Sequence, residues 1–224
     1  MSKEKLIQLQ FALFFEEMDN RPDKFINKID EALDGVFDQM PTILPIPADA
    51  PPEIPSVTMQ SSNGLYVCNI AKNRIDFVMN CINSGDSASV IFENFISKIR
   101  LFSNVVFGSK NIIRFGFIGR YFYKRNDPAK VIQSKYFKDD LGELEEINLR
   151  FNKRFESNDL SFNDVVEISK GSVSENNGPE QYGIVIQRDM NNIPVVSLQK
   201  EDMLSVIKSR EDNFKLSGIS ELVL

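Results

Sequence analysis

Residues 57–79 read VTMQSSNGLYVCNIAKNRIDFVM and predict three short antiparallel strands joined by two tight turns. Asn63-Gly64 is a strong signal for a two-residue hairpin turn, and Lys72-Asn73 gives a second turn. The first turn sets Met59 opposite Cys68, and the second sets Cys68 opposite Phe77. Both registers place the same eight apolar side chains on one buried sheet face: Val57, Met59, Tyr66, Cys68, Ile70, Ile75, Phe77 and Met79. Because two turns and one alternation agree, this meander anchors the prediction of an antiparallel sheet.

The segments around this meander complete a first half of the chain. Residues 6–15 are apolar on both faces of a strand, which is typical of a central position in a sheet. A helix is expected over residues 22–38, with Pro22 in its first turn. A second, strongly amphipathic helix is expected over residues 87–107, with Asp86 as its N-cap and Gly108 as its stop.

The second half repeats this order of elements. Asp127-Pro128 opens a short helix that ends near Lys138. The other expected elements are strands at 111–123, 144–155, 161–169 and 182–188 and a final helix at 200–214. The sequence therefore predicts the α+β class: an antiparallel sheet with helices packed on it, built from two pseudo-repeated β-α-β-β-β-α halves, 1–108 and 109–224, in one compact unit.

Residues 41–55 contain six of the ten prolines and connect the first helix to the meander. Such a segment is neither a helix nor a central strand, because proline removes a backbone donor. We expect an extended connection over the surface. The alternative interpretation is a proline motif that binds an aromatic groove of another protein.

Composition excludes several classes of site. Histidine is absent, so triads with a histidine base, histidine-ligated metal sites and imidazole switches are ruled out. The two cysteines, Cys68 and Cys81, are not cross-strand partners in the predicted register, so we expect two buried free thiols. With no signal peptide and no apolar run long enough to span a membrane, we expect a soluble cytoplasmic protein with no membrane contact.

Other candidate sites have ordinary structural interpretations. Gly116 and Gly119 lie in a strand pattern and indicate close packing or a bulge rather than a phosphate loop. Residues 189–192 resemble part of a calcium loop, but we expect a turn between strands. Two carboxylate clusters could hold Mg²⁺ or act as an acid/base pair, and we interpret them instead as solvated acidic rims: Glu16, Glu17 and Asp19, and Asp139, Asp140, Glu143, Glu145 and Glu146. No cofactor is expected.

Charge is distributed unevenly along the chain. Residues 98–138 contain ten basic residues against one acid, Asp127, although the whole chain carries a net charge of −6. The functional interpretation of this asymmetry is a binding site for an anionic partner: an acidic protein, a nucleotide or a nucleic acid. The structural interpretation, which we favour over nucleic acid, is that these basic residues pair with the acidic rims of this same protein or of a second copy. The candidate binding residues are Arg114, Arg120, Lys124, Arg125 and Lys130.

Several short motifs together resemble a sporadically distributed, uncharacterised family of bacterial proteins. They are APPEIP at 50–55, SNGL at 62–65, IRFGFIGRY at 113–121, and the ending with Asn213-Phe214 and ISEL at 219–222. Members are similar to proteins of mobile-element or phage-defence neighbourhoods, so the resemblance implies an antiviral role. It implies no catalytic residues.

The leading functional hypothesis is a non-enzymatic cytoplasmic interaction or regulatory protein. It would act as a homo-oligomer or as a subunit of a protein complex. The alternative is a nucleic-acid-binding module that uses the basic residues 98–138. A second alternative is an enzyme with a carboxylate-bound metal ion.

Overall fold

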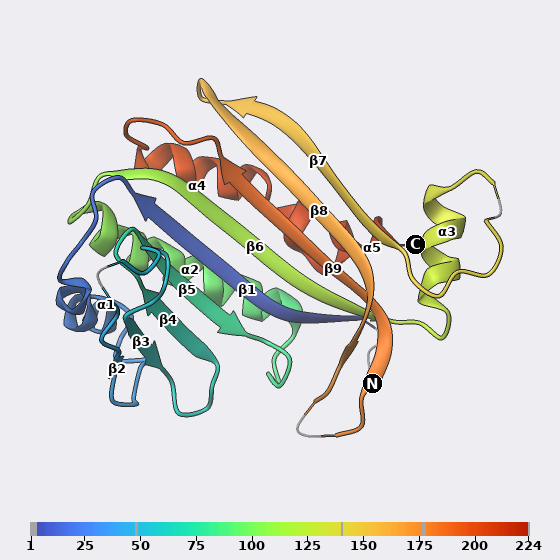
Figure 1. Ribbon diagram of the computed structural model, residues 1–224, viewed down its shortest axis with the longest axis horizontal. Helices are drawn as coiled ribbons and strands as arrows, with labels where there is room; N and C mark the ends of the chain where they lie inside the picture. Colours follow the sequence, from blue (N-terminus) through green and yellow to red (C-terminus); the bar gives the residue numbers. More distant parts are fainter. Residues whose placement is uncertain (1–3, 48, 140, 176–177, 224) are drawn as a thin grey trace.

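The computed structural model describes residues 4–47, 49–139, 141–175 and 178–223. Within these ranges nine strands form one antiparallel sheet in the order β2-β3-β4-β5-β1-β6-β9-β8-β7. Figure 1 shows the helices α2, α4 and α5 together behind this sheet, with α3 beyond its edge. The predicted α+β class is confirmed.

The elements follow the expected order in both halves, apart from one added short strand in the first half and one added short helix at the end of the second. The first half contains β1 (Glu4–Phe15), a 3₁₀ turn η1 (Pro22–Phe25), α1 (Ile26–Ala32), β2 (Thr42–Ile43), β3 (Val57–Gln60), β4 (Tyr66–Ile70), β5 (Arg74–Asn80) and α2 (Ala88–Phe107). The second half contains β6 (Ile112–Lys124), α3 (Pro128–Tyr136), β7 (Asn148–Ser157), β8 (Leu160–Val173), β9 (Gln181–Asn192), α4 (Lys200–Ser209), a 3₁₀ turn η2 (Glu211–Phe214) and α5 (Leu216–Ser220).

The two halves meet where β1 pairs with β6, at the centre of the sheet. On either side of this pair, the last strand of each half lies next to its first strand: β5 pairs with β1, and β9 pairs with β6. The sheet therefore runs without interruption from one half into the other. The interpretation of the halves as a repeat stays a prediction.

The predicted registers of the meander are confirmed. Met59 lies opposite Cys68, and Cys68 lies opposite Phe77. Seven of the eight predicted side chains are buried, and Tyr66 is half-buried. At the first turn Gly64 takes a φ of 68°, a left-handed conformation that glycine adopts without steric cost.

The core lies between the sheet and the helices. Phe77 is at its centre, with its ring stacked on the rings of Phe95 and Phe102 at centroid distances of 5.4 and 5.6 Å. Both partners lie on the buried face of α2, as the helical spacing predicts. Stacked rings of this kind stabilise the packing beyond the area that they bury.

Two of the predicted helices are shorter in the structure. The expected helix 22–38 is η1 followed by α1, which ends at Ala32, because Asp34 and Gly35 take φ values of 62° and 68°. Left-handed residues cannot continue a right-handed helix. The expected helix 200–214 is α4, which ends at Ser209, followed by η2.

Three local predictions need correction or refinement. Residues 189–192 are the end of β9 and not a turn, because their polar side chains alternate with the buried Met190 along a strand. Ser87, and not Asp86, is the N-cap of α2, and its Oγ accepts from the backbone N–H of Val90 at 3.4 Å. At Gly119 the Tyr121 ring fills the space that a Cβ would occupy, so close packing is confirmed there.

The proline-rich connection is extended around β2, as expected, but two turns follow, in which the N–H groups of Ala50 and Ile54 donate to the carbonyls of Pro47 and Pro51. It contributes only β2, which lies at the edge of the sheet and pairs with β3. No helix within the described ranges is both long enough and apolar enough to cross a membrane.

One buried amide joins the end of β9 to the start of β6. The Oδ1 atom of Asn192 accepts from the backbone N–H of Phe115 at 2.8 Å. Its Nδ2 atom donates to the carbonyl oxygens of Ile113 and Ile193 at 3.1 and 2.9 Å. The side chain is fully buried, so a substitution leaves these backbone groups without partners and without water.

We expect Asn192→Ala to lower the free energy of unfolding by about 3 kcal/mol, because it removes a side chain that satisfies several buried groups. The matched control is Asn152→Ala on the exposed strand β7, which we expect to change stability by no more than about 0.5 kcal/mol. Urea denaturation followed by circular dichroism measures both. Equal stabilities of the two variants would contradict this role for Asn192.

Candidate functional site

The sheet has one face that the helices cover and one face that they leave open (Figure 1). Because side chains alternate along a strand, the residues between the core positions point away from the helices. We call this surface the open face. At its centre it carries Gln8, Gln10 and Phe14 of β1, Arg114, Ile118 and Arg120 of β6, and Gln187 and Asp189 of β9.

A hydrogen-bonded row of side chains crosses the open face through Arg120. Its Nε donates to Oε1 of Gln187 at 2.8 Å, and its Nη1 donates to Oε1 of Gln8. Gln8 in turn donates to Oδ1 of Asn80 at 2.8 Å, so the row connects β5, β1, β6 and β9. The guanidinium of Arg120 is thereby fixed by neutral amides.

A second arginine lies further along β6. Arg114 stacks over the Phe14 ring at 5.3 Å from its centroid, and Arg74 of β5 lies over the same ring at 4.9 Å. Arg74 also forms a two-pronged ion pair with Asp76, at 2.7 and 2.5 Å. The Nε of Arg114 is buried and has no hydrogen-bond partner within the described ranges.

Asp189 of β9 lies opposite Ile118 of β6, and its carboxyl interacts electrostatically with Arg114. Burial raises the pKa of its carboxyl, while a hydrogen bond from Asn191 at 3.0 Å and the charge of Arg114 act in the opposite direction.

The five predicted binding residues do not form one group. Arg114 and Arg120 lie on the open face, and Lys124 is exposed at the end of β6. Arg125 turns back so that its guanidinium lies over the Tyr123 ring and donates to the carbonyl of Lys124. Lys124 and Arg125 line a hollow of about 470 Å³, whereas Lys130 on α3 lines a separate hollow of about 450 Å³.

The carboxylate clusters are mostly exposed. Glu16 and Glu17 are exposed, and Asp19 forms an ion pair with Lys110 at 2.8 Å. In the second cluster Asp139, Glu143, Glu145 and Glu146 are exposed, and Asp140 lies outside the described residues. Across the described ranges, no three cysteine or carboxylate side chains come together as a metal site would require.

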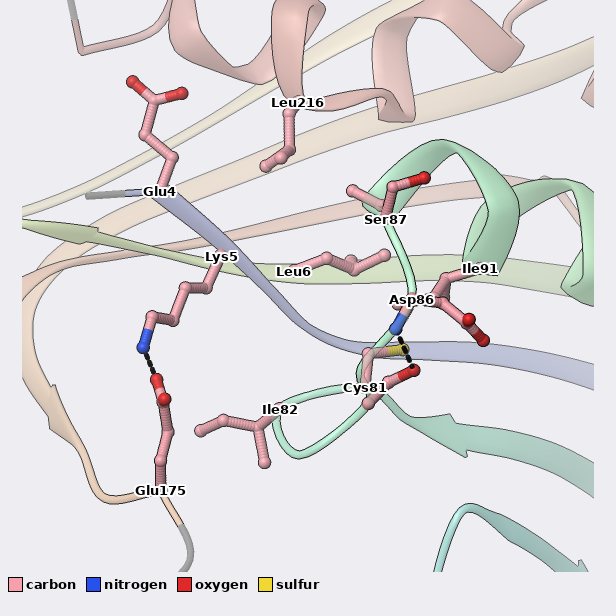
Figure 2. A pocket seen from close by; sticks show the side chains of 12 residues that line it. Glu4, Lys5, Leu6, Cys81, Ile82, Asp86, Ser87, Ile91, Glu175 and Leu216 are labelled. Atoms are coloured by element: carbon pink, nitrogen blue, oxygen red, sulfur yellow. Dashed lines mark hydrogen bonds and ion pairs between the residues drawn. The ribbon is translucent and has the colours of Figure 1, made fainter. Parts of the chain in front are cut away.

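A cavity of about 410 Å³ lies between the start of β1 and the first turn of α2. Figure 2 shows Leu6, Ile82 and Leu216 on its wall, with an ion pair between Lys5 and Glu175 at one side. Burial and the nearby charge of Lys124 lower the pKa of Lys5. The cavity thus offers an apolar wall beside a paired charge.

The one thiol at this cavity is not an activated nucleophile. Cys81 is buried, its Sγ donates to the carbonyl of Met79 at 3.3 Å, and burial raises its pKa to about 12. Only the thiolate attacks electrophiles, so Cys81 is unreactive near neutral pH. Burial raises the pKa of Cys68 as well, and both thiols are free, as predicted.

Comparison with known proteins gives no further guide, since neither the family models nor the curated proteins contain a match to this chain. The resemblance to a bacterial family stays a prediction.

Sequence reasoning found Arg114 and Arg120 but missed the amides that hold Arg120. Gln8 and Gln187 lie 112 and 67 positions away from it in the chain. A usable signal was present in β1, where Gln8 and Gln10 alternate with Leu9 and Phe11 and so mark a polar sheet face.

The two buried thiols predict a loss of stability in alkali. In the unfolded chain a thiol ionises near about pH 8.5, whereas in the fold both thiols stay protonated to higher pH. Above this pH the unfolded state binds fewer protons than the folded state, so stability falls as the pH rises. Each thiol contributes a slope of about 1.4 kcal/mol per pH unit.

Between about pH 8.5 and about pH 10.5, the free energy of unfolding falls in both proteins. We expect the fall to be smaller by about 2.5 kcal/mol in Cys81→Ala than in the wild type. Urea denaturation at a series of pH values measures the slopes, and the comparison cancels the ionisation of the tyrosines. Parallel slopes for the two proteins would show that folding does not raise the pKa of Cys81.

Proposed function

We propose that the protein is a non-enzymatic cytoplasmic binding protein that acts as a subunit of a protein complex. In this proposal an acidic surface of a partner protein docks on the open face. The observation that supports it most directly is the cross-strand row that fixes Arg120 between Gln8 and Gln187. Two free thiols fit a reducing compartment.

Arg120 is prepared for a carboxylate partner. Its described hydrogen bonds use Nε and Nη1, and both acceptors are neutral amides, so the positive charge remains available to an incoming anion. Because the guanidinium is already fixed, a partner spends little conformational entropy on ordering it. Arginine recognises carboxylates through paired donors, which gives direction as well as attraction.

The aromatic residues of the open face favour a protein over single-stranded nucleic acid. Bases stack on exposed aromatic rings. Phe14 is covered by Arg74 and Arg114, and Phe122 on the same strand face as Arg120 is fully buried. The predicted cations are also divided between the open face and two separate hollows. A role in a mobile-element or phage-defence locus is part of the proposal and rests on the family resemblance.

A photo-crosslinking amino acid at Ile118, next to Arg120 on the open face, tests this proposal in the native host. We expect irradiation to give a protein adduct that survives nuclease treatment and is lost when Arg120→Glu is added, because the reversed charge repels a carboxylate. Mass spectrometry identifies the partner and the crosslinked peptide. The sequence around that peptide shows whether the contacted surface is acidic.

The control carries the same crosslinker at Val196, which is 86% exposed and lies beyond β9. An adduct from Val196 but not from Ile118 would place the partner elsewhere and refute the proposal. A nuclease-sensitive adduct at Ile118 would support the nucleic-acid alternative. An adduct that joins two copies of the chain would identify a homo-oligomer instead.

A further inference from the structure

The proline-rich connection exposes large apolar side chains around β2. Met40, Ile43, Leu44 and Ile54 are 91%, 59%, 52% and 42% exposed. All four lie in the short segment that contains β2 and its flanking prolines. We call these four residues the β2 patch. Ile43 and Leu44 line one hollow, and contiguous exposed apolar side chains mark interaction surfaces more often than single ones do.

A hollow of about 310 Å³ opens in this surface. Its apolar wall is formed by Ile43, Leu44, Ile46 and Val57. Lys72 also lines it, as do Asp19 and Asp23, which form ion pairs with Lys110 and Arg21. Pockets for small molecules occupy roughly 300–1,000 Å³, so this hollow is at the lower end and fits one or two side chains. An apolar side chain that fills such a pocket is the usual anchor of a protein interface.

The edge of β2 offers an added strand few backbone donors. Leu44 directs its N–H inward to the carbonyl of Ser56 at 2.8 Å, and Pro41 and Pro45 have no N–H. In antiparallel pairing alternate residues point outward, so Ile43 alone offers an outward N–H between the two prolines. This edge therefore favours a partner that binds through its side chains over one that adds a strand.

The surroundings of the β2 patch are acidic. Residues 16–55 contain ten carboxylates against three basic residues. Figure 1 shows that α1 and β2, which this segment forms, lie at one end of the molecule, far from α3. Two copies that met through this acidic end would repel each other, so charge disfavours a two-fold dimer here and favours a basic occupant.

We propose that the β2 patch and its hollow bind a basic segment of a partner protein that inserts an apolar anchor side chain into the hollow. Lysine or arginine residues beside the anchor face the carboxylates of residues 16–55. This surface lies on a different part of the molecule from the open face, so the inference does not depend on the function proposed above.

Selection of random twelve-residue peptides displayed on phage tests the inference, with the full-length wild type as bait and Leu44→Asp for counter-selection. We expect the enriched peptides to share one apolar residue flanked by lysine or arginine. Leu44→Asp should weaken their binding at least about tenfold, since it places a charge on the wall of the hollow. Fluorescence anisotropy with the synthesised peptides measures the affinities.

Two further variants separate the apolar and the charge contributions. Asp49→Lys combined with Glu53→Lys should weaken the peptides about fivefold at low salt and less at high salt, because surface charges are screened. Val196→Asp, an equally drastic change at an exposed apolar residue outside the β2 patch, should leave binding unchanged. Circular dichroism confirms that each variant is folded.

Several results would overturn the inference. They are the absence of any peptide enriched after counter-selection, enrichment of acidic peptides whose binding is lost in Leu44→Asp, or equal binding of the enriched peptides to Leu44→Asp. Light scattering adds one more: a wild-type dimer that Leu44→Asp converts to a monomer would show that a second copy occupies the β2 patch. None of these results bears on the crosslink at Ile118, so the two proposals fail separately.

Discussion

The pairing of β1 with β6 is the constraint on which the rest of the structure depends. The two strands share eleven paired positions at the centre of the sheet, and each also carries the last strand of its own half. Their register places Phe11 opposite Phe117 on the helix side and Gln8 opposite Arg120 on the open side. A slip of one residue would exchange the two faces, so that Arg120 would enter the core and Phe117 would face solvent. The same pairing therefore determines both the hydrophobic core and the polar surface.

The meander at 57–79 could be predicted in detail because everything that defines it is local. Two turns a few residues apart set its registers, and the alternation of side chains checks them. The predictions were wrong where the deciding contact comes from a residue far away in the sequence, or where the backbone takes a left-handed conformation. The helical spacing continued past Ala32, but Asp34 and Gly35 turn left-handed and end α1. Residues 189–192 are polar enough for a turn, yet they continue β9. There the buried side chain of Asn192 forms hydrogen bonds with the backbone of Phe115 and Ile113 in β6.

The candidate site was predicted in its residue types but not in its arrangement. The excess of basic residues between 98 and 138 identified Arg114 and Arg120, and strand alternation could have placed both on one face. It could not separate them from Lys130, which α3 carries to another part of the surface, or show that Arg125 folds back over Tyr123. Nor could it find Gln8 and Gln187, because the order of the strands, and not the order of the chain, makes them neighbours of Arg120.

The two proposed surfaces differ in the interactions that form them and in the sign of their charge. On the open face, hydrogen bonds between strands fix the charged side chain of Arg120. At the β2 patch, exposed apolar side chains lie in a connection whose prolines restrict the backbone. Both surfaces are ordered before binding, which lowers the entropy that a partner must lose. Their charges are of opposite sign, with a basic stretch in β6 and an acidic one in residues 16–55, although the net charge of −6 conceals this. A partner that suits one of the two proposed surfaces is repelled by the other, so the two proposals assign a different partner to each surface.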